Sequence, residues 1–161
     1  MRILSPVELA VAVSLSGSVL AAALPPFVRN LHASRLVEPI DGVSELGARA
    51  VAFAATRPTE SAFPASVGLT PAQVPRGERV TDPPGTWDHP TWRALEFSFS
   101  VPHSFSFAFE SKNGDALATF RAIAHGDLDA DGILSTFEIR GETRPGAQPS
   151  ATPLEVHREV E

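Results

Sequence analysis

The chain has 161 residues, 43% of them hydrophobic, which suffices for the core of one ordinary domain and argues against wholesale disorder. Its 13 basic and 19 acidic residues give a net charge of -6 without any basic stripe, which argues against a nucleic-acid-binding protein. The absence of cysteine excludes thiol catalysis, disulfides and cysteine-ligated metal sites.

The first segment, residues 1–28, contains an uncharged run from Leu9 to Val28 between Glu8 and Arg29. About twenty such residues can cross the apolar core of a bilayer, roughly 30 Å thick. A cleavable signal peptide ending near Ala21-Ala22-Ala23 and a plain single-span anchor are two simple interpretations. Glu8 argues against both, because a carboxylate carried to the bilayer centre costs about 2.5–3.5 kcal/mol and usually has a partner. We therefore predict a helix of a membrane or filament core, in which Glu8 is paired.

Residues 29–57 predict the amphipathic half of the same helix, ending at about Thr56 before Arg57-Pro58. Pro25, Pro26 and Pro39 are expected to kink or locally melt the helix. The apolar positions recur at three- and four-residue spacing. They are Leu36, Ile40, Val43, Leu46, Gly47, Ala50, Phe53 and Ala54.

Residues 58–94 are rich in proline and predict a connecting loop, in which helix is excluded and a long strand is not expected. Trp87 and Trp92 are expected to bury against the core, with stacking on carbohydrate as the lesser alternative.

Residues 95–144 predict an antiparallel sheet of about four strands, so the fold class is α+β, with a long N-terminal helix packed on the sheet. Phenylalanines alternate at 97 and 99 and again at 105, 107 and 109. Residues 112–115 predict a hairpin turn, and 117–124 and 133–140 two further strands. Residues 145–161 are expected to form a loose tail.

The most specific chemical motif begins at Asp127 and fits D-x-D-x-D-G-x-x-[ST]-x-x-E at every position. Alternate side chains of a tight loop converge on one point, and Gly132 permits the sharp turn. The pattern predicts a Ca²⁺ site, because three crowded carboxylates repel one another without a cation. The candidate ligands are Asp127, Asp129, Asp131, the Ile133 carbonyl, Ser135 through water, and Glu138.

The flanks of this motif predict strands and not the helices of an EF-hand. We therefore expect a loop at a hairpin tip that acts as a staple and not as a sensor. If the hairpin turns within the loop, Glu138 points away and leaves the aspartates, the Ile133 carbonyl and water. An acidic turn without any ion is the simpler alternative. The five histidines are scattered, and no phosphate loop or G-x-S-x-G motif occurs, so we expect no enzymatic activity.

The N-terminal half resembles type IV pilins and the related pseudopilins. The resemblance rests on Glu8, Gly17 and Pro25, which keep the family's spacing of nine and eight within an apolar helix. It covers residues 4–57 well and 70–141 more loosely, through the Trp87 to Trp92 block and the acidic hairpin. The three residues before Leu4 correspond to a leader much shorter than usual, with Ile3 where the family usually has glycine.

This resemblance implies a structural subunit of a type IV pilus or a type II secretion filament. Glu8 would pair with the N-terminal amine of a neighbouring subunit, and helix breaks at Gly17 or Pro25 would let the subunit stretch on packing. The chain would be anchored in the inner membrane and then assemble with copies of itself into a periplasmic or extracellular filament. The alternative is an exported or single-span anchored calcium-binding domain that forms no filament.

Overall fold

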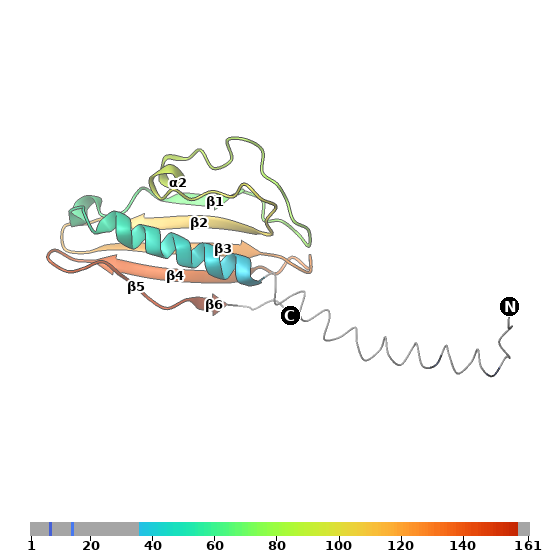
Figure 1. The fold of residues 1–161 in the computed structure, drawn as a ribbon. Helices are drawn as coiled ribbons and strands as arrows, with labels where there is room; N and C mark the ends of the chain where they lie inside the picture. Colours follow the sequence, from blue (N-terminus) through green and yellow to red (C-terminus); the bar gives the residue numbers. More distant parts are fainter. Residues whose placement is uncertain (1–6, 8–13, 15–35, 158–161) are drawn as a thin grey trace. The chain divides into compact units, whose positions relative to one another are not determined.

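The computed structural model describes Val7, Ser14 and residues 36–157. The chain divides into two compact units, Met1–Leu36 and Val37–Glu161, and the strands that the structure describes belong to the second. The described part opens with a long helix that covers residues 36–54 (Figure 1). The later elements are η1 (Thr59–Ser61), β1 (Val67–Thr70), α2 (Pro90–Ala94), β2 (Phe105–Lys112), β3 (Ala118–Gly126), β4 (Ser135–Thr143), β5 (Ser150–Ala151) and β6 (Glu155–His157).

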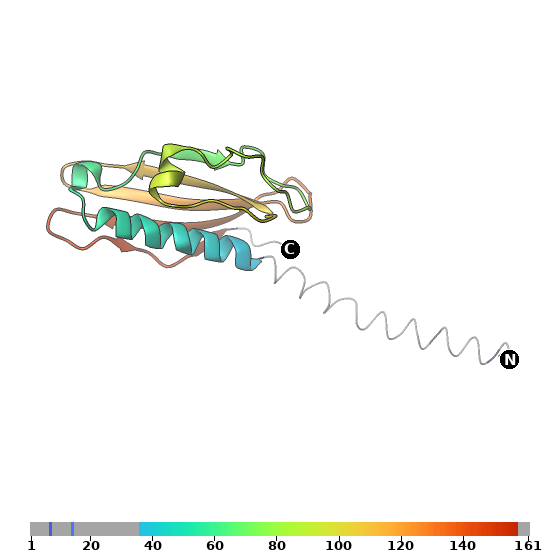
Figure 2. The same cartoon turned by 45° about the horizontal axis from the view of Figure 1, so that its top comes forward.

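The strands form one antiparallel sheet in the order β1-β2-β3-β4, and both β5 and β6 pair with β4. The turned view in Figure 2 shows the helix and the sheet as two layers. The α+β class is therefore confirmed. The expected number of about four strands was wrong, because the described residues form a sheet of six. The additional strands are short and lie where proline-rich sequence predicted loops.

The expected strands at 105–109, 117–124 and 133–140 coincide with β2, β3 and β4, and residues 112–115 lie between β2 and β3. The prediction of a strand around Phe97 and Phe99 was wrong, because that segment has no regular secondary structure. Glu96 adopts a positive φ of 51°, which an extended strand does not accommodate. Phe97 and Phe99 instead pack against Trp87.

Two expectations for the proline-rich parts of the chain were also wrong. Residues 58–94 do contain a helix, α2, which begins at Pro90. The missing N–H of proline costs nothing there, because the first N–H groups of a helix have no partner within it. The His89 ring caps the helix by accepting a hydrogen bond from the Thr91 amide (3.2 Å). The tail expected to be loose adds β5 and β6 to the sheet.

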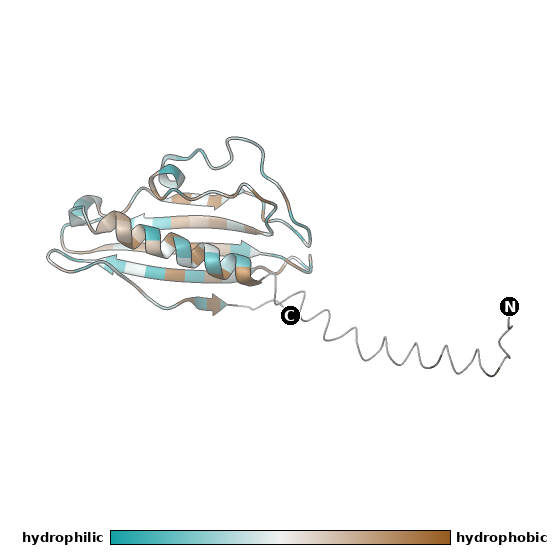
Figure 3. Cartoon of the chain, in the orientation of Figure 1, coloured by the Kyte–Doolittle hydropathy of each residue, from teal (hydrophilic) through white to brown (hydrophobic). Residues whose placement is uncertain are grey.

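The long helix buries one stripe against the sheet, made of Val43, Leu46, Ala50 and Ala54. Figure 3 shows apolar and polar residues alternating along it. Two glycines allow close approach: a Cβ on Gly42 would lie 2.5 Å from the Phe107 ring of β2, and one on Gly47 would lie 3.0 Å from Ile139 of β4. The helix thus contacts strands on both sides of β3.

The outer edges of the expected stripe are less buried. Ile40 is exposed, and Phe53 is half-buried with the Arg57 guanidinium 3.5 Å from its ring centroid. The helix continues through Pro39 and ends at residue 54, two residues before the expected end.

The two tryptophans are part of an aromatic cluster between the proline-rich segment and β2. Trp87 lies 5.4 Å from Trp92 and 6.5 Å from Phe107, measured between ring centroids. Both indole N–H groups are satisfied, by Asp82 (2.7 Å) and Thr70 (2.9 Å) respectively. The expected burial of both rings is confirmed, and neither face is available for stacking on a sugar.

The assembly residues Glu8, Gly17 and Pro25 lie outside the described residues. Within the part of the chain that is described, no helix combines the length and the apolar character needed to cross a membrane.

Candidate metal centre

The aspartate loop connects β3 to β4. Gly126 and Ser135 are paired across the hairpin, so the loop comprises residues 127–134. The Ser135 hydroxyl closes its base by donating to the Gly126 carbonyl (3.1 Å). Positive φ values at Ala130 (63°) and Gly132 (88°) curl the backbone, and the second falls on the glycine expected to make the sharp turn.

This curl brings the three aspartates together. Asp127, Asp129 and Asp131 each offer a carboxylate oxygen, and these oxygens lie within 4.8 Å of one another. Asp127 is buried, while the other two are exposed. At such separations like charges repel, so the arrangement favours a neutralising cation.

Hydrogen bonds from the loop backbone hold the carboxylates in place. Asp129 accepts from the Asp131 amide (3.2 Å), and Asp131 accepts from the Ile133 amide (2.6 Å). The Gly132 amide donates to Asp127 Oδ2 (3.2 Å). The first two are turns in which an aspartate bonds to the backbone two residues on, which helps to preorganise the loop.

The other oxygen of Asp127 is the most informative atom of the loop. Asp127 Oδ1 is buried and has no hydrogen-bond partner among the described residues. An unpaired buried carboxylate oxygen costs about 1–3 kcal/mol or more. A hard cation that prefers oxygen ligands, such as Ca²⁺, would satisfy it. The residues therefore fit a cation, and the calcium assignment remains a proposal.

The remaining sequence candidates occupy different positions. Ile133 lies in the loop with its side chain exposed. The Ser135 hydroxyl donates its hydrogen bond to the Gly126 carbonyl. Glu138 lies in β4, opposite Ile123 of β3, and is 2% exposed. Its carboxylate binds Arg121 and Arg140 and stands apart from the three aspartates.

The electrostatics of Glu138 follow from these partners. Hydrogen bonds from Arg121 and, less strongly, from Arg140 lower the pKa of Glu138 from 4.5 to about 2, although burial opposes the shift. The same contact raises the pKa of Arg121 further above its ordinary range. Arg121 also binds Glu110 of β2 (2.8 Å), so the ion pairs cross three strands. We therefore leave Glu138 out of the proposed ligand set.

The structure adds a residue that the sequence motif does not contain. Arg76 lies in the proline-rich segment, and its Nε is 3.6 Å from Asp127 Oδ2. The Gly77 amide donates to the Asp127 carbonyl (2.8 Å) in a bridge between the two segments. Because the contact joins residues about fifty positions apart in a segment without periodicity, the sequence offered no sign of it.

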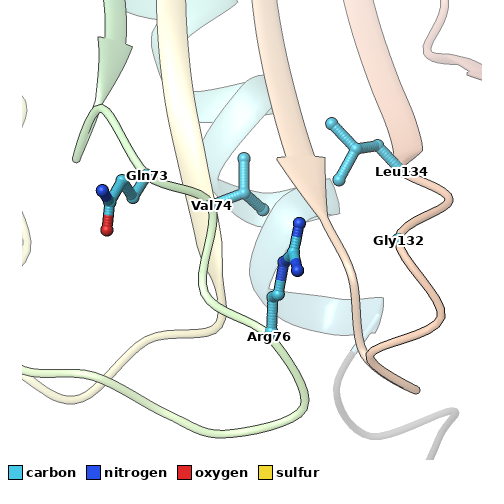
Figure 4. A pocket seen from close by; sticks show the side chains of 5 residues that line it. All are labelled: Gln73, Val74, Arg76, Gly132 and Leu134. Carbon is cyan, nitrogen blue, oxygen red and sulfur yellow. The ribbon is translucent and has the colours of Figure 1, made fainter.

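A hollow of about 650 Å³ opens beside this contact, lined by Gln73, Val74, Arg76, Gly132 and Leu134. Figure 4 shows the Arg76 side chain rising between Val74 and the loop that carries Gly132 and Leu134. The loop and the proline-rich segment thus form its two walls.

A second polar cluster lies inside the aromatic core. Asp82 Oδ2 contacts His103 Nε2 (2.8 Å) as well as the Trp87 indole, and His103 Nδ1 contacts the Phe105 carbonyl (2.8 Å). The side chains of His103 and Asp82 are 1% and 6% exposed. This burial points to a structural clasp between the proline-rich segment and β2.

Comparisons with family models, curated proteins and solved structures found no match to this chain.

Proposed function

We propose that the chain is a structural subunit of pilin or pseudopilin type, in which an apolar N-terminal helix drives filament assembly and calcium staples the head. The observation that carries the proposal is a helix packed by one face on an antiparallel sheet. The uncharged run from Leu9 to Val28, with its Glu8, Gly17 and Pro25 spacing, precedes that helix in the sequence.

An exposed side of the long helix supports an assembling role. Val37 is 53% exposed, Ile40 at the edge of the buried stripe is 37% exposed, and the small residues Ser44 and Ala48 are exposed beside them. Small and apolar residues on an open helix face suit close contact with other helices. In the proposed filament, that face meets the helices of neighbouring copies.

Calcium would act as a staple for the head. The aspartate loop joins β3 to β4 and touches the proline-rich segment at Asp127. A cation held by Asp127, Asp129 and Asp131 would remove their mutual repulsion and satisfy Asp127 Oδ1. The expected consequence is a more stable head without any change of fold.

The alternative is an exported or single-span anchored calcium-binding domain. One observation favours it: the candidate ligands and the segment that contacts them all lie within the second compact unit. Calcium binding would then require no filament.

Intact mass and N-terminal sequencing of the protein from its native cell separate the two candidates. A start at Leu4, especially with a methylated amine, supports the pilin-like subunit. A start near Leu24 supports the exported domain and ends the filament proposal. An unprocessed Met1 in a monomeric membrane protein supports the single-span anchored domain.

A further inference from the structure

We infer that Arg76 is an internal counter-ion that competes with the divalent cation for Asp127 and thereby sets the affinity of the loop. This inference rests on the cation site proposed above and adds its regulation by a residue outside the motif. The contact that carries it is the 3.6 Å separation between Arg76 Nε and Asp127 Oδ2.

The charge balance of the loop supports competition. Three aspartates carry three negative charges, and Arg76 reduces the net negative charge of the cluster to two. Without Arg76 the cluster would carry three negative charges and attract the same ion more strongly. The buried position of Asp127 reduces screening by solvent, so the effect of a charge beside it is larger than on an open surface.

The geometry shows that Arg76 can give way. Its side chain is 71% exposed, and the Nε to Oδ2 separation is too long for a hydrogen bond. The adjoining hollow, walled by Gln73, Val74 and Leu134, offers room for the guanidinium (Figure 4). The segment itself stays attached, because the Gly77 amide binds the Asp127 carbonyl and not its carboxylate.

Asp127 is also held independently of Arg76. The Gly132 amide donates to Asp127 Oδ2, so the carboxylate keeps a donor when the arginine leaves. Its Oδ1 is the atom left for the cation. Arg76 therefore acts as a competing charge and not as the support that orients the ligand.

The test is calcium titration of the full chain by calorimetry, with Arg76→Gln beside the wild type. We expect Arg76→Gln to lower the dissociation constant by about three- to tenfold, because it removes one positive charge next to the ligands. Arg76→Lys keeps the charge and should stay within about twofold of the wild type. The difference between wild type and Arg76→Gln should shrink as salt is added.

Arg79→Gln is the matched control. Arg79 lies three residues further along the same segment and pairs with Glu38 of the long helix (3.3 Å), away from the aspartates. Its substitution removes the same charge from the chain and should leave the dissociation constant unchanged. Equal effects of the two substitutions would mean that net charge alone sets the affinity, which overturns the inference.

The melting temperature in chelator supplies a second measurement. Arg76→Gln should melt below the wild type there, since Asp127 has lost its only counter-ion among the residues described, and calcium should raise its melting temperature by more than that of the wild type. Unchanged or weaker calcium binding in Arg76→Gln would overturn the inference while leaving the staple intact. A wild type that binds no divalent cation would overturn both.

Discussion

The ring of Phe120 in β3 covers Gly141 in β4, its directly opposite partner in the sheet. A Cβ on Gly141 would lie 2.1 Å from Phe120 Cε1, so the aromatic ring occupies the space that any side chain would need. Phe105 covers Gly126 in the same way across the β2–β3 pair. Two cross-strand pairs of this kind restore the packing that a glycine inside a strand otherwise loses.

Gly141→Ala should therefore destabilise the protein. The new methyl group would also lie 2.6 Å from the Ser150 carbonyl, so both the ring and β5 must shift. We expect a loss of about 1–3 kcal/mol in the free energy of unfolding, measured by urea denaturation. Gly68→Ala in β1 is the control, because nothing lies within 4 Å of its added Cβ. Equal stabilities of the two variants would contradict the packing described for Phe120.

Asp129→Ala should abolish the stabilising effect of calcium. It removes one of the three clustered carboxylates while leaving the buried Asp127 in place. Melting temperatures with calcium and with chelator should differ in the wild type and coincide in the variant. Asp115→Ala, at the exposed turn between β2 and β3, removes the same charge elsewhere and should keep the calcium response. A wild type with the same melting temperature in both conditions would count against the staple.

The Glu138 ion pairs should make stability depend on pH in acid. Its pKa falls from 4.5 in the unfolded chain to about 2 in the fold, because Arg121 and Arg140 bind the ionised carboxylate. The folded state thus favours the charged form, so the contribution is complete above pH 4.5 and is lost as the pH falls toward 2. After allowance for screening by solvent around the exposed arginines, we expect about 2 kcal/mol.

Urea denaturation of wild type and Glu138→Gln between pH 2 and 6 checks this. The difference in the free energy of unfolding should be constant above about pH 5 and should narrow below it. A difference that does not change across this range would show that the glutamate contributes by packing alone.

Asp82→Ala should be among the most damaging substitutions in the proline-rich segment. It leaves the Trp87 indole and the His103 ring without their shared hydrogen-bond partner inside the aromatic core. Leaving two buried polar groups without a partner costs about 2–4 kcal/mol. Asp88→Ala, six residues on, breaks only an exposed ion pair with Arg93 and should cost less than about 1 kcal/mol in the same assay.

Glu8→Ala should leave the head folded and impair assembly. The residue lies outside Val37–Glu161, so the melting temperature of the head should be unchanged. Incorporation into filaments, measured by shearing and immunoblotting in the native cell, should fall. Normal incorporation would remove the proposed pairing of Glu8 with a neighbouring amine.

The parts of the fold that could be predicted from the sequence are those with a local pattern. The alternating phenylalanines of β2 bury one face of a strand, and the aspartates recur at the spacing of a tight loop. The burial of Trp87 and Trp92 was correctly predicted because large aromatic rings are usually buried, even beside polar neighbours.

The failures share a different cause, which is contact between residues far apart in the chain. Phe97 and Phe99 alternate like a strand, yet they pack on Trp87 and find no partner strand among the described elements. β5 and β6 are too short to show an alternating pattern of apolar and polar residues. They form strands because their backbones pair with β4. Arg121 and Arg140 bind the Glu138 carboxylate, which the motif assigned to the cation. The register of β3 and β4 places the arginines beside Glu138, and the sequence motif does not show this register.

The closeness of Trp87 and Trp92 determines what the protein's ultraviolet emission reports. The chain has two tryptophans and no tyrosine, and the two indole rings lie 5.4 Å apart between centroids. All tryptophan fluorescence therefore originates from one spot, where α2 and the proline-rich segment meet β2. An unfolding curve measured by fluorescence therefore reports unfolding around the two tryptophans. Local unfolding confined to β5 and β6, at the other edge of the sheet, leaves the emission unchanged. Circular dichroism, which averages over the whole backbone, is the complementary probe for the remainder of the sheet.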